Sequence, residues 1–370
     1  MDPVKILKRA WYILWSYRVL WVFGLILALA AGGAGSSGGG NNGVQWQEDS
    51  QSYQPPSYGS VQEFFDDFNR QMEKLFTQGI PEFDISGEAL TTFLWIVGIF
   101  VVFMFLVGIV VTIAYYVSET AVIRMVDEYE NSGNKMTVRQ GFRAGWSNTA
   151  WRLFLINLIV SLPAIILLIL LLAAGLGIYF AVTNGNANFA ALSVVTMIGF
   201  VFLMIFVVVI LSIVLHLLRN FFWRVCVLEG ASVSESLQRG FALVRENWKN
   251  VGLMWLVMIG LGIVWAIVSI IAVIVTIPVV IVTGIIATIV SAVPFLLLVG
   301  AFSLFLSGPL PWIAGGLFML PLFFVLAFSP WLLLGSWQAV YTSTVWTLTY
   351  REIKALPAPV MQPIPQPAGD

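Results

Sequence analysis

Arg224–Asn250, with the sequence RVCVLEGASVSESLQRGFALVRENWKN, joins one long apolar run of the chain to the next. Within it, Ser232 and Glu235 have the three-residue spacing of a capping box, which predicts a helix that begins there and runs towards Trp248. A basic amphipathic helix that leads directly into a hydrophobic run is typical of the cytoplasmic membrane interface, with an ordinary loop helix as the alternative. The apolar face of the predicted helix carries Leu237, Phe241, Val244 and Trp248.

Two earlier segments carry a weaker version of this pattern, which predicts that the unit is used three times. Leu237–Phe241 reads LQRGF, Val138–Phe142 reads VRQGF and Leu7–Trp11 reads LKRAW. All three place an apolar residue, two polar or basic residues, a small residue and an aromatic residue ahead of a hydrophobic run. A repeat this degenerate could also arise by coincidence. Each unit ends at a cytoplasmic arginine, namely Arg124, Arg224 and Arg351.

The small residue of the pattern is Gly141 or Gly240, and it is Ala10 in the first copy. A glycine inside a helix costs about 0.5 to 1 kcal/mol relative to alanine, so its use calls for a packing reason. We expect a small side chain, followed by an aromatic residue on the buried face, to let each helix lie flush against the inner ends of the spans. On this basis alanine should be tolerated at Gly240 and leucine should not.

Composition places the chain in a membrane. It is 59% hydrophobic and 10% charged with a mean hydropathy of +0.92, whereas soluble domains average about 25% charged residues. No Asp, Glu, Lys or Arg occurs in 89–118, 153–218 or 250–350, and a helix that spans the hydrocarbon needs about 20 apolar residues. These stretches predict membrane lipids as the main partner and no nucleic acid. The single Cys226 excludes an intramolecular disulfide.

The first hydrophobic segment allows two interpretations. A basic, aromatic helix precedes an apolar run from Val19 to Ala31, and Ala28-Leu29-Ala30 would also fit the end of a cleaved signal peptide. We expect an uncleaved first span, because the leader is long and aromatic and fits the repeat.

The segment 32–88 is expected to lie outside the cell. Its first half is rich in Gly, Ser, Asn and Gln and predicts a mobile loop. Residues 61–77 predict an acidic helix whose phenylalanines would pack on the protein's outer face or on a protein partner. The loop is strongly acidic, and since Lys and Arg accumulate on the cytoplasmic side, both termini are predicted inside a cell (plasma) membrane.

The predicted fold class is an all-α integral membrane protein with about six transmembrane helices in three two-span units, each preceded by a cytoplasmic amphipathic interfacial helix. The spans are about 19–34, 90–116, 153–182, 191–217, 251–275 and 322–347. The units are 1–128, 129–229 and 230–355, followed by a disordered Pro-rich cytoplasmic tail, 356–370.

The apolar residues 277–316 form an insertion in the third unit. Four prolines interrupt it, and we expect a hairpin that dips into the membrane, because one extra crossing would place Arg351 outside. Seven or eight crossings are the alternative. The prolines are Pro278, Pro294, Pro309 and Pro311.

No motif in the sequence names a reaction. It has no cluster with metal-ligand spacing, no phosphate loop and no nucleophile elbow, so we expect no catalytic, cofactor-binding or metal-binding residues. Polar residues do gather at the predicted inner ends of three spans, where they could line a cytoplasmic pocket. Snorkelling and interhelical hydrogen bonds are the favoured interpretation there, and Asn157 and Ser161 are likewise expected to form interhelical hydrogen bonds. The residues of the predicted pocket are Glu119, His216, Asn220, Gln338, Tyr341 and Thr342.

Val227–Trp248, VLEGASVSESLQRGFALVRENW, resembles a broad group of uncharacterised bacterial polytopic membrane proteins. The group includes the membrane-domain type that is attached to glycerophosphodiester phosphodiesterases. The resemblance implies a fold and a location in a bacterial inner membrane. It implies no enzymatic role, because the catalytic domain of those enzymes has no counterpart in this sequence.

Two classes of function follow from these observations. The first is a non-enzymatic membrane scaffold or lipid-interacting accessory component, favoured by the interfacial helices and by spans without central charges. The second is a transporter or permease for an apolar or zwitterionic solute, since parallel repeats occur in transporters and 277–316 could act as a gate. A membrane-embedded enzyme ranks third.

Overall fold

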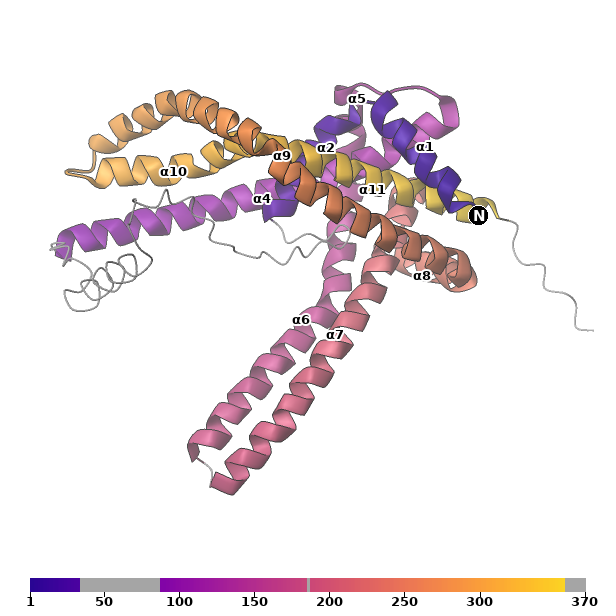
Figure 1. Ribbon diagram of the computed structural model, residues 1–370, viewed down its shortest axis with the longest axis horizontal. Helices are drawn as coiled ribbons and strands as arrows, with labels where there is room; N and C mark the ends of the chain where they lie inside the picture. The colour runs from indigo at the N-terminus through magenta and orange to yellow at the C-terminus, as the bar shows by residue number, and fades with distance from the viewer. Residues whose placement is uncertain (34–86, 185–186, 357–370) are drawn as a thin grey trace, which may run out of the picture. The chain divides into compact units, whose positions relative to one another are not determined.

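The computed structural model describes residues 1–33, 87–184 and 187–356, and every element within these ranges is a helix (Figure 1). The predicted all-α class is therefore confirmed for this part of the chain. The acidic helix predicted at 61–77 and the tail beyond 356 lie outside the described residues. The helices are α1 (Pro3–Ser16), α2 (Leu20–Gly33), α4 (Gly87–Ser132), α5 (Val138–Gly145), α6 (Asn148–Asn184), α7 (Ala187–Glu229), α8 (Val233–Glu246), α9 (Trp248–Ser303), α10 (Leu310–Ala327) and α11 (Ser329–Ala355).

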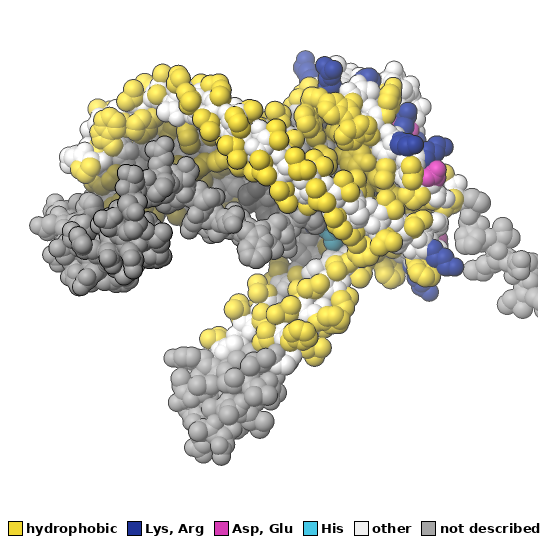
Figure 2. Space-filling model, in the orientation of Figure 1, with side chains coloured by type: hydrophobic (Ala, Val, Ile, Leu, Met, Phe, Trp, Pro, Cys, Tyr) yellow, Lys and Arg dark blue, Asp and Glu magenta, His cyan; other side chains and the backbone are white. Residues whose placement is uncertain are grey.

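Five of the described helices are long and apolar enough to cross a membrane, and a sixth crossing is added if α1 and α2, bent by 103°, form one span. These helices expose large apolar side chains, such as Trp95, Phe202 and Val275, at 70%, 75% and 67% of their full area. Hydrophobic side chains cover α9 and the described parts of α6 and α7 in Figure 2. Apolar surface on this scale is stable only in lipid, so the chain is a multi-pass membrane protein. The five candidate spans are Thr91–Ser132, Asn148–Ala173, Gly199–Glu229, Trp248–Ser303 and Leu310–Ala327.

The chain divides into two compact units. One comprises 1–41, 108–285 and 325–370, and the other comprises 42–107 and 286–324. In the second unit, Phe318 of α10 packs its ring against aromatic rings of α4 and α9, with centroids 5.3 to 5.6 Å apart. The first unit contains α1, α2, α5 to α8 and α11 together with residues 108–132 of α4 and 248–285 of α9, and it holds the polar residues considered below.

Within the first unit, α2 and α11 run antiparallel and approach closely through small residues. A Cβ atom placed on Gly24 would lie 2.5 Å from Oγ of Ser336, and one on Gly335 would lie 3.3 Å from Cβ of Ala28. The Ser336 hydroxyl donates a hydrogen bond of 2.9 Å to the carbonyl oxygen of Trp21. Close contact of this kind is what small residues provide between helices in lipid, where the hydrophobic effect adds little.

The short helices α5 and α8 follow long helices through similar turns. After α4 the chain turns at Gly133 with a φ of 73°, and after α7 it turns at Gly230 with a φ of 68°. Both values lie in the left-handed region, which glycine adopts without steric cost. Each short helix then begins with a capping box, which confirms the one predicted at Ser232 and Glu235. The other capping box consists of Thr137 and Gln140.

The buried glycines dock these short helices onto the long ones. A Cβ atom on Gly240 would lie 2.5 Å from Cδ1 of Phe222 on α7, and one on Gly141 would collide with Met125 on α4. The predicted packing role of both glycines is thus confirmed. Two details differ from the sequence expectation. Phe241 points outward and is 52% exposed, because the glycine itself forms the contact face, and the space at Gly240 is too small for alanine.

The segment 277–316, expected to be interrupted at four prolines, is broken at one place in the structure. The helix α9 continues through Pro278 and Pro294 to Ser303, and the chain turns at Leu304–Pro309. One proline removes one hydrogen bond, whereas ending a helix in lipid would expose several backbone groups without water to satisfy them, so a continuous helix costs less.

The predicted last span, 322–347, is also divided. α10 ends at Ala327 and α11 begins at Ser329, and α11 is absent from the five candidate spans of the described chain. Much of α11 is buried by protein, including Ser336, Ser343 and Thr347. Its hydroxyl-rich face therefore packs against α1, α2 and α7 rather than lipid.

Replacing Gly240 with alanine should lower the melting temperature of the detergent-solubilised protein. The new methyl group must displace the ring of Phe222, and overpacking of this kind costs about 1 to 3 kcal/mol. Gly252→Ala is the matched control, because a Cβ atom on this helical glycine meets nothing within 4 Å and alanine favours helix. An equal effect of the two substitutions would contradict the docking role of Gly240.

Candidate functional site

A buried ion pair links α4 and α7 in the first unit. Arg224 is 1% exposed and Glu119 is 6% exposed, and Nη2 of Arg224 lies 3.5 Å from Oε1 of Glu119. Two buried charges lose their hydration, so a pair of this kind is stable only when its remaining hydrogen-bonding groups are also satisfied.

Side chains from two further positions complete the environment of the pair. Ser343 of α11 donates a hydrogen bond of 2.8 Å to Oε1 of Glu119. The carbonyl oxygen of Ser343 accepts one of 3.1 Å from Arg224. On the other side, Nη1 of Arg224 donates to the carbonyl oxygen and the Oδ1 atom of Asn220, at 3.0 and 3.2 Å. The cluster thus ties together α4, α7 and α11.

A second buried guanidinium lies between α7 and α6. Arg219 is 7% exposed, and its two terminal nitrogens contact Oδ1 of Asn157 at 3.0 Å and Nδ1 of His216 at 2.9 Å. A guanidinium can only donate, so Nδ1 of His216 accepts and the imidazole is neutral with its proton on Nε2. The Cζ atom of Arg219 also lies 5.1 Å from the ring centroid of Trp223.

Charged residues also fasten the ends of the helices around this cluster. Arg124 donates to the carbonyl oxygen of Ala144 at 2.6 Å and to the hydroxyl of Thr149 at 2.9 Å, which joins α5 to α6. Arg152 donates to the carbonyl oxygen of Gly230 at 2.9 Å and so holds the turn between α7 and α8. Arg351 of α11 contacts the carboxylate of Asp127 on α4.

Glu229, the last residue of α7, accepts several hydrogen bonds from α8 and α11. It accepts hydrogen bonds from Lys354 at 2.8 Å, Arg239 at 3.1 Å and the Tyr350 hydroxyl at 2.5 Å. Burial raises the pKa of Tyr350 above its usual 10.0, and the bond to Glu229 raises it further, so the hydroxyl keeps its proton and donates.

The structure brings together three residues of the predicted pocket. Glu119, His216 and Asn220 all belong to the buried cluster, with Asn220 donating to the carbonyl oxygen of His216 at 3.0 Å. Tyr341 instead donates to the carbonyl oxygen of Leu7 at 3.3 Å and packs against α1. Gln338 and Thr342 lie half-buried on α11. A pocket lined by all six residues stays a prediction.

Sequence reasoning missed the two arginines and Ser343 as members of one site. In the sequence, Arg224 marks only the end of a repeat unit, and Arg219 carries no predicted role. A positional signal was available, because Arg219 lies three residues after His216 and Arg224 four residues after Asn220, so each pair shares one face of the helix. Asn157, expected to form an interhelical hydrogen bond, does so with Arg219. No group of three or more His, Cys, Asp or Glu residues that could hold a metal ion occurs in the described ranges.

The comparison with known protein families identifies a family for this chain. Residues 8–346 match the model of a family described as "Family of unknown function (DUF7544)". The chain belongs to this family. No curated protein and no solved structure matches the chain. The match to DUF7544 covers most of the chain, and the description of the family states no activity.

Replacing Glu119 with glutamine should destabilise the protein, because it leaves Arg224 buried and without its countercharge. Removing one partner of a buried pair costs about 3 to 5 kcal/mol, which thermal or denaturant unfolding in detergent can measure. The double variant Glu119→Leu with Arg224→Met should lose much less than the sum of the two single changes. Arg9→Gln, which breaks a pair with Glu130 in which the Arg9 side chain is 45% exposed, should cost under about 1 kcal/mol. Additive single and double effects would contradict a coupled pair.

Proposed function

We propose that the protein is a non-enzymatic membrane component that binds anionic lipid headgroups at the cytoplasmic face through the helices α1, α5 and α8. The observation that carries this proposal is the two-sided character of α5. Gly141 and Gly145 bury one side against the protein. On the free side, Phe142 and Trp146 stack with ring centroids 5.6 Å apart and are 46% and 62% exposed. Large exposed aromatic rings are typical of membrane interfaces.

The same combination recurs on α8 and at the start of α9. Phe241 and Trp248 are exposed, and Nζ of Lys249 lies 5.9 Å from the ring centroid of Trp248. Arg245 is exposed in the last turn of α8. Aromatic rings at headgroup depth beside cations suit a surface of anionic lipid.

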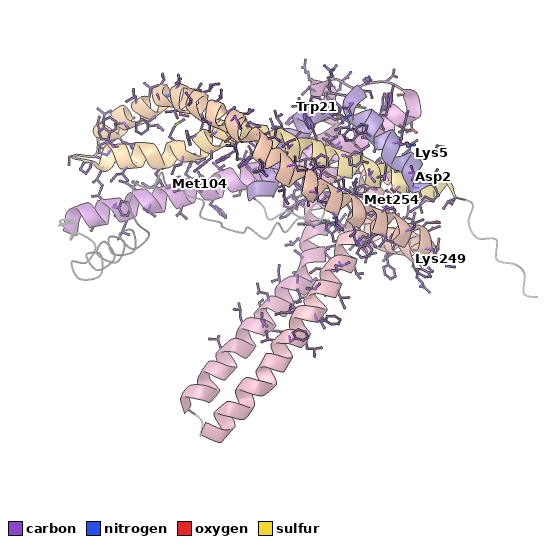
Figure 3. All side chains as sticks on the ribbon, viewed as in Figure 1. Asp2, Lys5, Trp21, Met104, Lys249 and Met254 are labelled. Atoms are coloured by element: carbon purple, nitrogen blue, oxygen red, sulfur yellow. The ribbon has the colours of Figure 1, made fainter. Side chains whose placement is uncertain are left out.

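The first helix adds a third surface of this kind. Trp11 and Tyr12 are exposed on α1, next to the exposed cations Lys8 and Arg9. In Figure 2, Lys and Arg side chains gather over α1, α5 and α8, and Figure 3 places Lys5 on α1 and Lys249 at the start of α9. We interpret the three helices as the interfacial elements of three two-span units, 1–128, 129–229 and 230–355. The likeness to the membrane-domain type attached to glycerophosphodiester phosphodiesterases supports fold and location only.

Lipid selectivity tests this proposal. The variant in which Arg139, Arg143, Arg245 and Lys249 are all changed to Gln should co-purify with less phosphatidylglycerol and should bind it at least about tenfold more weakly. Each Lys or Arg near an anionic surface contributes about 1 kcal/mol to the free energy of binding, so the loss of four of them exceeds a tenfold change in affinity. Native mass spectrometry in mixed phosphatidylglycerol and phosphatidylcholine nanodiscs provides the measurement.

A matched control changes Arg70 and Lys74, the two basic residues of the acidic loop, to Gln. This variant should keep the lipid preference of the parent. If the two variants behave alike, the lipid-binding function is wrong. Solute flux through proteoliposomes of the parent would instead support a transporter.

Orientation is tested separately by cysteine labelling. In a Cys226→Ser background, a cysteine at Ser57 should react with an impermeant reagent in intact cells, whereas one at Ser132 should react only after lysis. The expectation follows from the excess of Lys and Arg around 124–152 and 219–249. Labelling of Ser132→Cys in intact cells would place the three helices on the outer side and refute the cytoplasmic assignment.

A further inference from the structure

We propose that Arg219 and Trp223 form a binding site for a phosphate group between the inner ends of α4, α6 and α7. The inference deepens the proposed lipid-binding function, yet it rests on residues other than the surface cations of α5 and α8. The ligand class is a phosphate monoester or diester, of which a phospholipid headgroup and free phosphate are the two sources.

The charges of the buried cluster do not balance. It contains two guanidinium groups, Arg219 and Arg224, and one carboxylate, Glu119, which pairs with Arg224. Among the described residues Arg219 forms no ion pair, and its two terminal nitrogens contact an amide oxygen and a neutral imidazole. A buried cation without a countercharge favours an anion as its missing partner.

Three buried donors in the same region also lack acceptors. Nε of Arg219, Nε1 of Trp223 and Nε of Arg224 have no hydrogen-bond partner within the described part of the chain. All three groups can only donate, so they exclude a metal cation and select a ligand rich in acceptor oxygens. The Cζ atom of Arg219 lies 5.1 Å from the centroid of the Trp223 ring, so the unsatisfied donors of these two side chains lie in one region.

A phosphate group meets these requirements better than a carboxylate in one respect. It offers acceptor oxygens in several directions, which suits donors from two different side chains, since the guanidinium of Arg219 lies over the indole ring of Trp223. The polar cluster also reaches the surface, because His216 and Asn157 are only half-buried. Exposed apolar residues of α7 such as Ile213 and Val214 lie next to His216 in the sequence, so the approach to the site is bordered by lipid-facing surface.

Binding measurements on the delipidated full-length protein in detergent test the proposal. The probes are inorganic phosphate, dioleoyl-phosphatidylglycerol and dioleoylglycerol, which has the same chains without phosphate. Phosphatidylglycerol should bind saturably and raise the melting temperature, and dioleoylglycerol should do neither. Phosphate that binds and competes with the lipid identifies free phosphate as a ligand, whereas binding of the lipid alone identifies the headgroup. If neither phosphate-bearing probe binds, the proposal is overturned.

Two substitutions locate the binding to these residues. Arg219→Gln should weaken it at least about tenfold, since it removes the charge and the Nε donor. Trp223→Phe keeps an aromatic ring, removes only the N–H donor, and should weaken binding several-fold. If Arg219→Gln does not fold, Trp223→Phe decides, and parent-like affinity of that variant overturns the proposal by showing that water satisfies the donors.

The control is Arg239→Gln on α8, whose side chain is 58% exposed and which should bind like the parent. The variant with four surface substitutions separates this inference from the proposed function. Loss of saturable binding only in Arg219→Gln supports the buried site even if the surface helices contribute nothing. Loss only in the surface variant supports the interfacial helices and refutes the buried site.

Discussion

The first compact unit depends on the need to neutralise charge away from water. Arg224 is fully enclosed, and its environment is assembled from Glu119 on α4, Asn220 one turn earlier on α7, and Ser343 on α11. Burying a charge away from water costs several kcal/mol unless it is paired and hydrogen-bonded, so the three helices must meet for Arg224 to be tolerated. The requirement determines which helices contact one another, because apolar packing alone would distinguish poorly between different helix pairs in lipid.

Close approach of backbones is the second constraint. Gly24 and Gly335 bring α2 and α11 together, and Gly141 and Gly240 seat the short helices on α4 and α7. Since lipid removes most of the hydrophobic gain between spans, such contacts rely on dispersion and on hydrogen bonds such as that from Ser336. Only the other faces of the docked helices α5 and α8 are exposed, and those faces carry aromatic rings and cations.

These two constraints meet where α4, α6 and α7 lie together around Arg219 and Arg224. The arginine that pairs with Glu119 has a structural task, whereas Arg219 has neutral partners and an unsatisfied Nε. Structural ion pairs and ligand sites can thus lie side by side on one helix, and the balance of charge distinguishes them.

Much of the fold follows from local sequence, and the site does not. The apolar runs predict the long helices, and the capping box at Ser232 predicts where α8 begins. Gly240 predicts a close contact between helices. Each of these features depends on composition or on residues a few positions apart. The continuity of α9 through Pro278 was not predictable in this way, since it depends on the cost of exposed backbone in lipid.

The sequence by itself thus determined the membrane class, the helical content and the small residues that dock helices. Only the tertiary structure decided which polar residues meet, because Glu119, Arg224 and Ser343 lie more than one hundred residues apart in succession and no local pattern relates them. Tertiary structure likewise turned Phe241 outward and buried most of the polar face of α11, since burial depends on which neighbour occupies each face.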